Sequence, residues 1–446
     1  MNTKRIVRWV IVLFLLAALP GLTVALAQGQ EPPAKQPLPA VTELSESLSP
    51  VYANLNESEP NNTFATADVM AYGDAMAATI SAPGDVDYFK FQILDVGGPT
   101  RPYSADETLI NLDAQSIGSP LDTVVTLYNN AGNMIGSNDD TDTRDSLYYY
   151  KLLPGWYYLK VEDFGNNNGG ANYIYNLMVA KILLISAAAA NLGTATIDGI
   201  PFQAGDILAT YAAGANPTWN RWVMFFDISD LGINKNVDKL ATMGNSADIL
   251  IGFQVNVTLP GTSIVAKPQD IVRFQPGKYG GTTQGTMYRY MIGANNDLTT
   301  SAEKLDAIGD WMAGRPGGVV CNGYPVSTIG AATVNKVGGG TFKAADEDVF
   351  CKASAAGGGF GLWNQYFDNS LVPGLAAEDV VAFDYNEYLE AGYFVIQGTG
   401  NIAGHPVNQN QIFSLWPPQP SWRNLSWDGP AYGWIWNIDA IDVSYR

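Results

Sequence analysis

The chain has 446 residues, a formal net charge of −19 at pH 7 and a hydrophobic content of 47%. This length predicts two or three domains, and the hydrophobic content excludes a chain that is disordered throughout. The negative charge excludes nucleic acid as a partner because phosphates would be repelled, and plentiful Gly, Tyr and Trp with scarce Lys and Glu favour strands and turns over helices.

Residues 1–27 have the pattern of a secretory signal. An apolar run at residues 9–19 precedes a small-x-small cleavage site, and it follows the basic residues Lys4, Arg5 and Arg8. An uncleaved membrane anchor is the alternative, although the apolar run is short for a membrane span. We therefore expect a secreted, extracellular protein that begins at Gln28 and has no stable membrane span after signal removal. Residues 28–53 are rich in Pro, Gln, Ser and Ala, which predicts a flexible linker.

Residues 54–180 are predicted to form an antiparallel β-sandwich. Three stretches alternate between apolar and polar residues as half-buried strands do, at residues 88–93, 123–128 and 156–161. Clusters of Asn and Gly separate the stretches, and short strands at such spacing are typical of a sandwich.

Residues 181–446 contain a weak internal repeat with a period of roughly 60 to 80 residues. The first unit of the repeat is a polar residue followed by an apolar strand, and its copies begin at Gly205, Gln269, Glu347 and Asn410. The second unit has the copies Val237-Asp238-Lys239-Leu240, Leu305-Asp306-Ala307-Ile308, Val380-Val381-Ala382-Phe383 and Ile438-Asp439-Ala440-Ile441. Four copies predict a small β-propeller of about four blades, with a two-sheet β-sandwich as the alternative. The fold class expected for the whole chain is therefore all-β.

Two segments of the repeat region carry a specific expectation. Residues 301–312 have local helix propensity, but their place in the repeat predicts a strand. The last copy of the repeat lacks the apolar strand that follows the second unit elsewhere, and residues 181–185 form such a strand with no repeat of their own. We expect the two to pair, because pairing removes two open sheet edges. The alternative is that residues 181–185 belong to the preceding sandwich.

The sequence contains no credible catalytic centre. His405 is the only histidine, so any Ser-His-Asp or Cys-His centre would have to use it. The Gly-x-Ser-x-Gly and His-Glu-x-x-His patterns are missing, while a pair of carboxyl groups for glycoside hydrolysis stays open. The two cysteines, Cys321 and Cys351, form either a disulfide or two buried free thiols. The tryptophans of residues 416–436 serve either as packing between sheets or as a platform for sugars.

Two polar clusters in residues 54–180 could bind calcium. The first is Glu57-Ser58-Glu59-Pro60-Asn61-Asn62, and the second is Gly84-Asp85-Val86-Asp87. Calcium takes six to eight oxygen ligands, largely from carboxylates, amides and main-chain carbonyls. The alternative is turn chemistry, because Asn and Asp side chains bind their own backbone in loops.

A set of motifs in this region resembles the bacterial pre-peptidase C-terminal domain. The motifs follow the family's order and are Glu-x-Glu-Pro-Asn-Asn at 57–62, Gly-Asp-x-Asp-Tyr-Phe at 84–89, 121–124, 138–140 and 153–161. The resemblance implies a small β-sandwich beside secreted enzymes, and relatives in clostridial collagenases bind collagen and a pair of calcium ions. Carried over by motif position, the calcium ligands are Glu57, Glu59, Asn61, Asn62, Asp85 and Asp87. Collagen binding does not carry over, since no binding face can be matched. The rest of the chain faintly resembles repeat segments of uncharacterised secreted bacterial proteins.

These observations leave two functional classes. The first is a secreted, non-enzymatic, calcium-binding protein that binds or adheres to an extracellular protein or polysaccharide. The second is a secreted, glycoside hydrolase-like enzyme acting through paired carboxylates, with residues 54–180 as its accessory domain. An exposed pocket holding two acids about 5 to 10 Å apart would favour the hydrolase.

Overall fold

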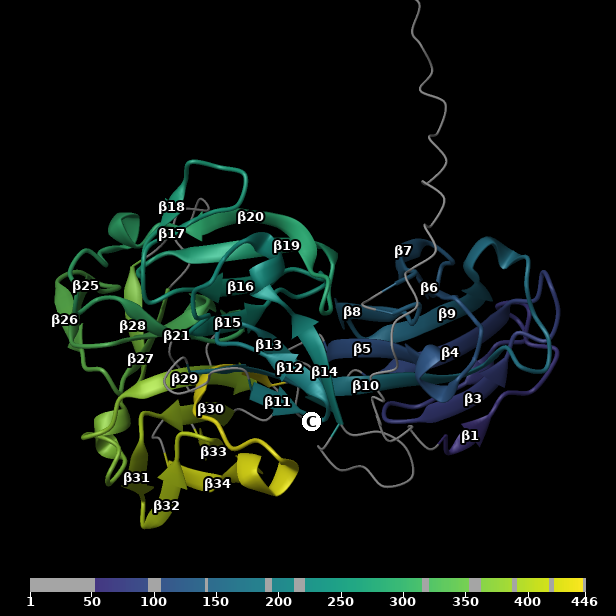
Figure 1. The fold of residues 1–446 in the computed structure, drawn as a ribbon. Coiled ribbons are helices and arrows are strands. Elements are labelled where there is room, and N and C mark those ends of the chain that lie inside the picture. Colours follow the sequence, from purple (N-terminus) through teal and green to yellow (C-terminus); the bar gives the residue numbers. More distant parts are fainter. Residues whose placement is uncertain are drawn as a thin grey trace, which may run out of the picture. The chain divides into compact units, whose positions relative to one another are not determined.

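The computed structural model describes residues 53–94, 106–140, 143–188, 195–211, 221–314, 321–352, 362–386, 391–416 and 421–443. These residues form strands and short 3-10 turns, with no α-helix among them (Figure 1). The fold is therefore all-β, as the composition predicts. No helix in the described part of the chain has the length and hydrophobicity that a membrane crossing requires. The secretory signal and almost all of the linker predicted from the sequence lie outside the described residues.

Two sheets form the first part of the fold, which we call the two-sheet module. One sheet has the strand order β1 (Leu55–Asn56), β3 (Ala75–Thr79), β10 (Ile174–Ala187), β5 (Asp106–Asp113) and β8 (Leu147–Leu152). The other has the order β2 (Asp68–Val69), β4 (Asp87–Ile93), β9 (Gly155–Asp163), β6 (Thr123–Asn129) and β7 (Met134–Asn138). Strands β4, β6 and β9 contain the three alternating stretches, which confirms them as strands. The expectation of purely antiparallel pairing was wrong in detail, since β1 pairs with β3 and β2 with β4 in parallel.

Alternation along the strands creates the core of this module. In β4, Phe89, Phe91 and Ile93 are buried, while the residues between them are partly or fully exposed. They share one hydrophobic cluster with residues of the opposite sheet such as Ile110 and Leu177. Burying a side chain of this size stabilises the fold by about 1.5–3 kcal/mol, so the period of two holds the sheets together.

Four antiparallel four-stranded sheets make up the rest of the fold. The first has the order β35 (Ile438–Val443), β10, β13 (Ile207–Tyr211) and β14 (Arg221–Phe226). The second has the order β15 (Lys239–Thr242), β16 (Ile249–Gly252), β19 (Ile271–Lys278) and β20 (Gln284–Met291). The third has the order β21 (Leu305–Ile308), β24 (Pro325–Thr328), β27 (Val349–Lys352) and β28 (Trp363–Phe367). The fourth has the order β29 (Val380–Asn386), β30 (Ala391–Ile396), β33 (Gln411–Trp416) and β34 (Ser421–Asp428).

Each sheet carries the same additions, so the weak sequence repeat is a structural repeat. A hairpin precedes the third strand: β11 (Ala195–Ile197) with β12 (Ile200–Phe202), β17 (Val257–Thr258) with β18 (Val265–Ala266), β25 (Ala332–Asn335) with β26 (Thr341–Ala344), and β31 (Thr399–Ile402) with β32 (His405–Asn408). A 3-10 turn follows the fourth strand: η3 (Ile228–Leu231), η4 (Gly293–Asn296), η6 (Asn369–Leu371) and η7 (Gly429–Tyr432). The third sheet has one further hairpin, β22 (Met312–Gly314) with β23 (Cys321–Gly323).

The acid of the first repeat unit connects these additions. Asp270 accepts backbone N–H groups of Lys267 before the third strand and of Gly293 in the 3-10 turn, at 3.0 and 2.9 Å. Asp206 and Asp348 make the equivalent pairs of bonds in their own sheets. The motif is therefore structural, because each carboxylate accepts hydrogen bonds from two backbone N–H groups that would otherwise lack this acceptor.

Strand β10 belongs to both parts of the fold (Figure 1). Its first half pairs with β3 and β5 of the two-sheet module, and its second half pairs with β13 and β35. The predicted pairing of residues 181–185 with the last repeat is confirmed, with Leu184 opposite Asp442. The alternative, that residues 181–185 belong to the preceding sandwich, is met only by Lys181, which lies opposite Thr108 of β5. The domain boundary expected after residue 180 falls inside β10.

The first strands of the four sheets lie together. β35 contacts β15, β15 contacts β21, β21 contacts β29, and β29 contacts β35. Residues 305–308 form strand β21, so the repeat overruled local helix propensity as expected. These contacts bring side chains from all four sheets close to one another, and acidic side chains lie among them.

Covalent and aromatic contacts settle two open alternatives. Cys321 and Cys351 form a disulfide, with their Cα atoms 5.7 Å apart. Trp427 and Trp434 are buried and pack against Trp222, so these tryptophans serve as packing between sheets. Trp416 differs, because it is 40% exposed and lies against the guanidinium group of Arg423.

Candidate metal centre

Three segments of the two-sheet module position the residues proposed from the sequence as calcium ligands. Glu57 follows β1, and its Oε1 accepts a hydrogen bond of 2.6 Å from the backbone N–H of Thr79 at the end of β3. The loop that continues from Glu57 is tied to the start of β4, because Tyr88 N donates to the carbonyl oxygen of Asn61 at 2.9 Å. The residues of the first motif are thereby brought beside those of the second.

The structure gathers three of the six proposed ligands. Glu57, Glu59 and Asp87 each offer a carboxylate oxygen, and these oxygens lie within 4.8 Å of one another. Calcium binds oxygen at about 2.3–2.6 Å, so two ligands of one ion are at most about 5 Å apart. The three carboxylates therefore fit a single calcium ion.

Three buried oxygens at the same place have no hydrogen-bond partner among the described residues. Oε2 of Glu57, Oδ1 of Asn61 and Oδ1 of Asp87 are buried and accept no hydrogen bond from the described residues. Asn61 and Asp87 are fully buried. A buried acceptor without a partner costs about 1–3 kcal/mol, and a cation among these oxygens would remove that cost.

Burial and mutual repulsion change the acidity of the cluster. Burial, opposed by the hydrogen bond from Thr79 and reinforced by the charge of Glu59, raises the pKa of Glu57 to about 7. Burial raises the pKa of Asp87 to about 8, although the hydrogen bond from Tyr175 acts in the opposite direction. A bound cation favours the ionised carboxylates and reverses both shifts.

Asn62 and Asp85 have a different role. The Asn62 side chain donates to Oδ1 of Asp85 at 2.7 Å, and Oδ2 of Asp85 accepts from the backbone and side chain of Ser81. Both Asp85 oxygens are therefore engaged in holding the turn before β4. Turn chemistry, which was the alternative for the whole motif, describes this pair, and the ligand assignment of Asn62 and Asp85 stays untested.

The different roles of Asp85 and Asp87 follow from their positions relative to strand β4. Asp87 is in phase with Phe89 and Phe91, whose side chains face the core, whereas Asp85 precedes the strand. Asp87 accordingly lies in the cluster with Glu57 and Glu59.

Two supporting residues were missed. Asp68 Oδ2 accepts a bond of 2.8 Å from Ser58 N and one of 3.4 Å from the Asn61 amide, which orients Asn61. Tyr175 donates to Asp87 at 2.6 Å from a strand 88 residues away. Asp68 follows the motif closely in sequence, whereas the contact of Tyr175 depends on the packing of a distant strand.

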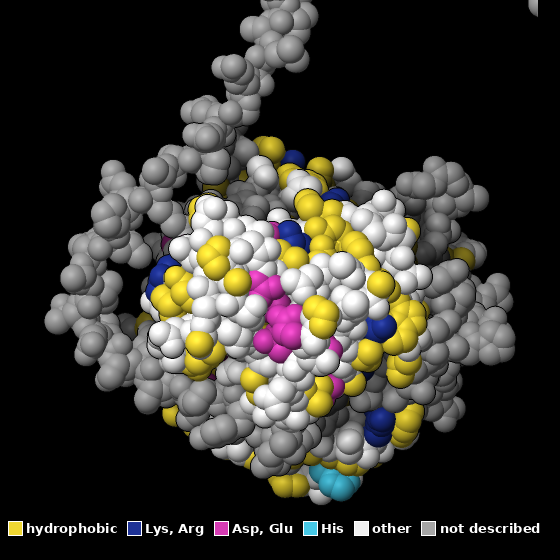
Figure 2. Space-filling view, turned by 90° about the vertical axis from the view of Figure 1, so that its right-hand side faces the viewer, with side chains coloured by type: hydrophobic (Ala, Val, Ile, Leu, Met, Phe, Trp, Pro, Cys, Tyr) yellow, Lys and Arg dark blue, Asp and Glu magenta, His cyan; other side chains and the backbone are white. Residues whose placement is uncertain are grey.

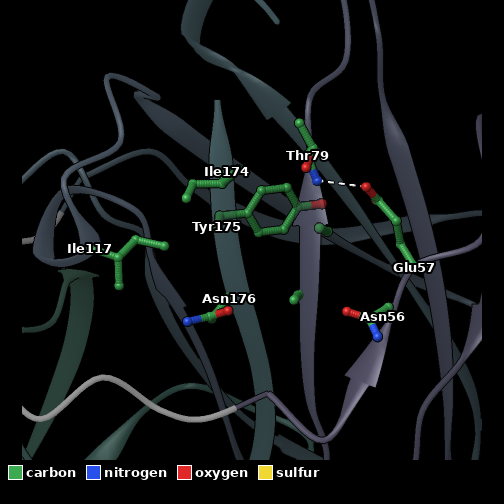
Figure 3. A pocket seen from close by; sticks show the side chains of 9 residues that line it. Asn56, Glu57, Thr79, Ile117, Ile174, Tyr175 and Asn176 are labelled. Atoms are coloured by element: carbon green, nitrogen blue, oxygen red, sulfur yellow. Dashed lines mark hydrogen bonds between the residues drawn. The ribbon is translucent and has the colours of Figure 1, made fainter. Parts of the chain in front are cut away.

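A pocket of 370 Å³ adjoins this cluster (Figure 3). Its polar lining comes from β1, the residue after it and β10, and consists of Asn56, Glu57, Tyr175 and Asn176. Its apolar lining includes Ile117 and Ile174. Glu57 is the one carboxyl group among the lining residues. This pocket therefore does not hold the pair of acids that a glycoside hydrolase would need.

The face turned toward the viewer in Figure 2 carries a compact group of Asp and Glu side chains, with Lys and Arg only at separate places around it. Glu59 is exposed and Glu57 is partly exposed, so the cluster is accessible from solvent.

His405 is also exposed, and its ring stacks on Trp422 with the centroids 4.3 Å apart.

Comparisons with known proteins found two partial similarities. No model of a known protein family matches the chain. A probable subtilase-type serine protease of Deinococcus radiodurans is 32% identical over 107 residues, which are 23% of this chain and 14% of the protease. The crystal structure of the pre-peptidase C-terminal domain of a Bacillus anthracis collagenase matches 25% of this chain and 93% of that domain, with 16% identity and a TM-score of 0.20. About a quarter of this chain is thus similar to a pre-peptidase C-terminal domain.

Proposed function

We propose that this chain is a secreted, calcium-binding protein without catalytic activity, which binds an extracellular protein or polysaccharide. The observation that carries the calcium part is the cluster of Glu57, Glu59 and Asp87 with its unsatisfied buried oxygens. Three carboxylates and one amide oxygen suit a hard cation such as Ca²⁺. The ion would join the loop after β1 to the start of β4 and so stabilise the module.

Export is supported by two features of the chain. The leader pattern of residues 1–27 is that of a secretory signal. The disulfide between Cys321 and Cys351 suits an oxidising compartment, since cytosolic thiols are kept reduced.

The architecture that we propose is a β-sandwich followed by a β-propeller of four blades. The support is the shared strand order of the four sheets, the pairing of β10 with β35 and the cyclic contacts of their first strands. Such a ring protects its sheet edges without a helix layer. Propeller surfaces and sandwich faces both suit the binding of a macromolecular partner.

The names of the two compared proteins raise a different enzyme class, that of secreted proteases. One is a probable serine protease and the other domain comes from a collagenase. We propose that the module here accompanies the repeat region in place of a catalytic domain. A serine protease would have to use His405, and that imidazole stacks on Trp422 at the surface.

A thermal titration tests the calcium site. Ca²⁺ at about one hundred times its dissociation constant should stabilise the full chain by about 2.7 kcal/mol, and chelator should remove the effect. Glu59→Gln should reduce the calcium response without unfolding the chain, because it removes one ligand of this site and Glu59 is exposed. Glu162→Gln is the matched control, since it removes an acid of the same module that pairs with Lys160 away from the cluster. Equal responses from Glu59→Gln and the unaltered chain would refute the site.

A binding screen tests the partner class. The mature chain is applied to arrays of glycans and extracellular proteins, with calcium and with chelator. Binding to members of one class supports the proposal, and its calcium dependence reports whether the metal centre takes part. Release of cleaved products in place of binding would favour the hydrolase.

A further inference from the structure

A second cluster of acids lies where the two-sheet module meets the repeat region. Glu107 of β5, Asp310 after β21 and Asp442 of β35 each offer a carboxylate oxygen, and these oxygens lie within 4.8 Å of one another. Three segments far apart in sequence therefore converge on one point. The spacing of the oxygens is again within the reach of one divalent cation.

One ammonium group partly balances this cluster. Lys151 Nζ lies 2.7 Å from Glu107 Oε1 and 2.7 Å from Thr242 Oγ1, and it contacts Oδ2 of Asp310. Its three donors are thereby used. Asp384 lies nearby and binds backbone, since its two oxygens accept from Asp310 N at 3.0 Å and Val443 N at 2.9 Å.

Carboxyl groups outnumber cationic groups around this cluster in the described part of the chain. Four of them, those of Glu107, Asp310, Asp384 and Asp442, face the ammonium group of Lys151. Buried charges are costly unless they are paired or bind a metal.

The atoms left without a partner point into the cluster. Asp442 is fully buried, and neither of its carboxylate oxygens accepts a hydrogen bond from any described residue. Oε2 of Glu107, a residue that is 2% exposed, is likewise unsatisfied. The hydroxyl group of Tyr149 in β8 is a further buried polar group without a hydrogen-bond partner in the described parts of the chain. It interacts electrostatically with Glu107, Asp442 and Asp310.

We propose that Glu107, Asp310 and Asp442 bind one hard divalent cation of the calcium type at the junction of the two-sheet module and the repeat region. The cation takes the unsatisfied oxygens of Asp442 and Glu107, beside the ammonium group of Lys151. It joins β5 of the module to β35 and to the end of β21. This site is separate from the cluster of Glu57, Glu59 and Asp87, and either site can exist without the other.

The test counts bound ions on the full mature chain. The first site is silenced with Glu59→Gln and Asp87→Asn together, and this variant is dialysed against Ca²⁺ or Mn²⁺ before elemental analysis. We expect the silenced variant to keep a bound ion and Asp442→Asn, added to it, to remove that ion. Asp230→Asn is the control, because Asp230 is an exposed acid of the repeat region.

Two outcomes overturn the proposal. One is a silenced variant that holds no ion, and the other is an unchanged ion count in Asp442→Asn. If Asp442→Asn does not fold by near-UV circular dichroism, Glu107→Gln replaces it, because glutamine keeps an oxygen for Lys151 and Thr242 while the charge is lost. An ion that is lost in Glu59→Gln but kept in Asp442→Asn belongs to the first site. Failure of one proposal therefore leaves the other testable.

Discussion

The phenol hydroxyl of Tyr175 donates a hydrogen bond of 2.6 Å to Oδ2 of Asp87, whereas Oδ1 of the same carboxyl group is buried and accepts none within the described part of the chain. One oxygen of Asp87 is thus held in place by the protein. The other is the oxygen that we propose as a ligand of the ion.

Tyr175→Phe should weaken calcium binding to the first site without removing it. The hydroxyl lowers the pKa of Asp87 against the effect of burial, so its loss lets protons compete more strongly with calcium. We expect a higher calcium dissociation constant at pH 7 and a smaller difference from the unaltered chain at pH 9. Isothermal titration at both pH values measures this, and an equal loss at both would mean that the hydroxyl acts only through packing.

The metal-free chain should lose stability as the pH rises from 6 to about 8. The folded pKa values of Glu57 and Asp87 are raised to about 7 and about 8, above the ordinary values near 4 of an unfolded chain. The folded state therefore binds more protons than the unfolded state, and this contribution is full below the unfolded pKa and lost as the pH passes the folded pKa. Melting curves in chelator check the slope.

Calcium should flatten the same pH profile, since the ion binds the ionised carboxylates and replaces the protons. Asp87→Asn should also reduce the slope in chelator. A metal-free melting temperature that rises between pH 6 and 8 would contradict the assignment of raised pKa values to this cluster.

Removal of residues 438–446 should make the chain aggregate or unfold without cooperativity. This truncation deletes β35, which covers one edge of β10 and buries Ile438, Ile441 and Val443. An open apolar edge in the middle of the fold is an aggregation hazard. The matched control ends at Val443 and keeps the strand; it should stay soluble and melt cooperatively. Light scattering and calorimetry distinguish the two, and similar behaviour would refute closure through this pair of strands.

Asp270→Ala should destabilise the second sheet by about 2 kcal/mol, because two backbone donors, Lys267 N and Gly293 N, lose their acceptor. Denaturant unfolding measures the change. Asp230→Ala serves as the control because that acid is exposed, and it should change stability by less than about 0.5 kcal/mol. Equal effects would mean that the repeated acid has no capping role.

The sequence by itself determined the strands, the repeat and the pairing of β10 with β35. Alternation with a period of two identifies β4, β6 and β9, because each side chain must face either core or solvent. The repeat identified Leu305–Ile308 as a strand although its neighbours favour a helix. The repeat also places an acid within two residues after three of its second units, at Asp310, Asp384 and Asp442.

Only the tertiary structure decided which polar residues meet. Asp85 and Asp87 are two residues apart, yet one closes a turn and the other lies with Glu57 and Glu59. Lys151 reaches Asp310 across 159 residues, and Glu107 and Asp442 come from segments far apart in sequence. Local propensity and periodicity report on neighbours in sequence, whereas the charge and burial of a site depend on distant segments that meet only when the cores of several sheets have packed.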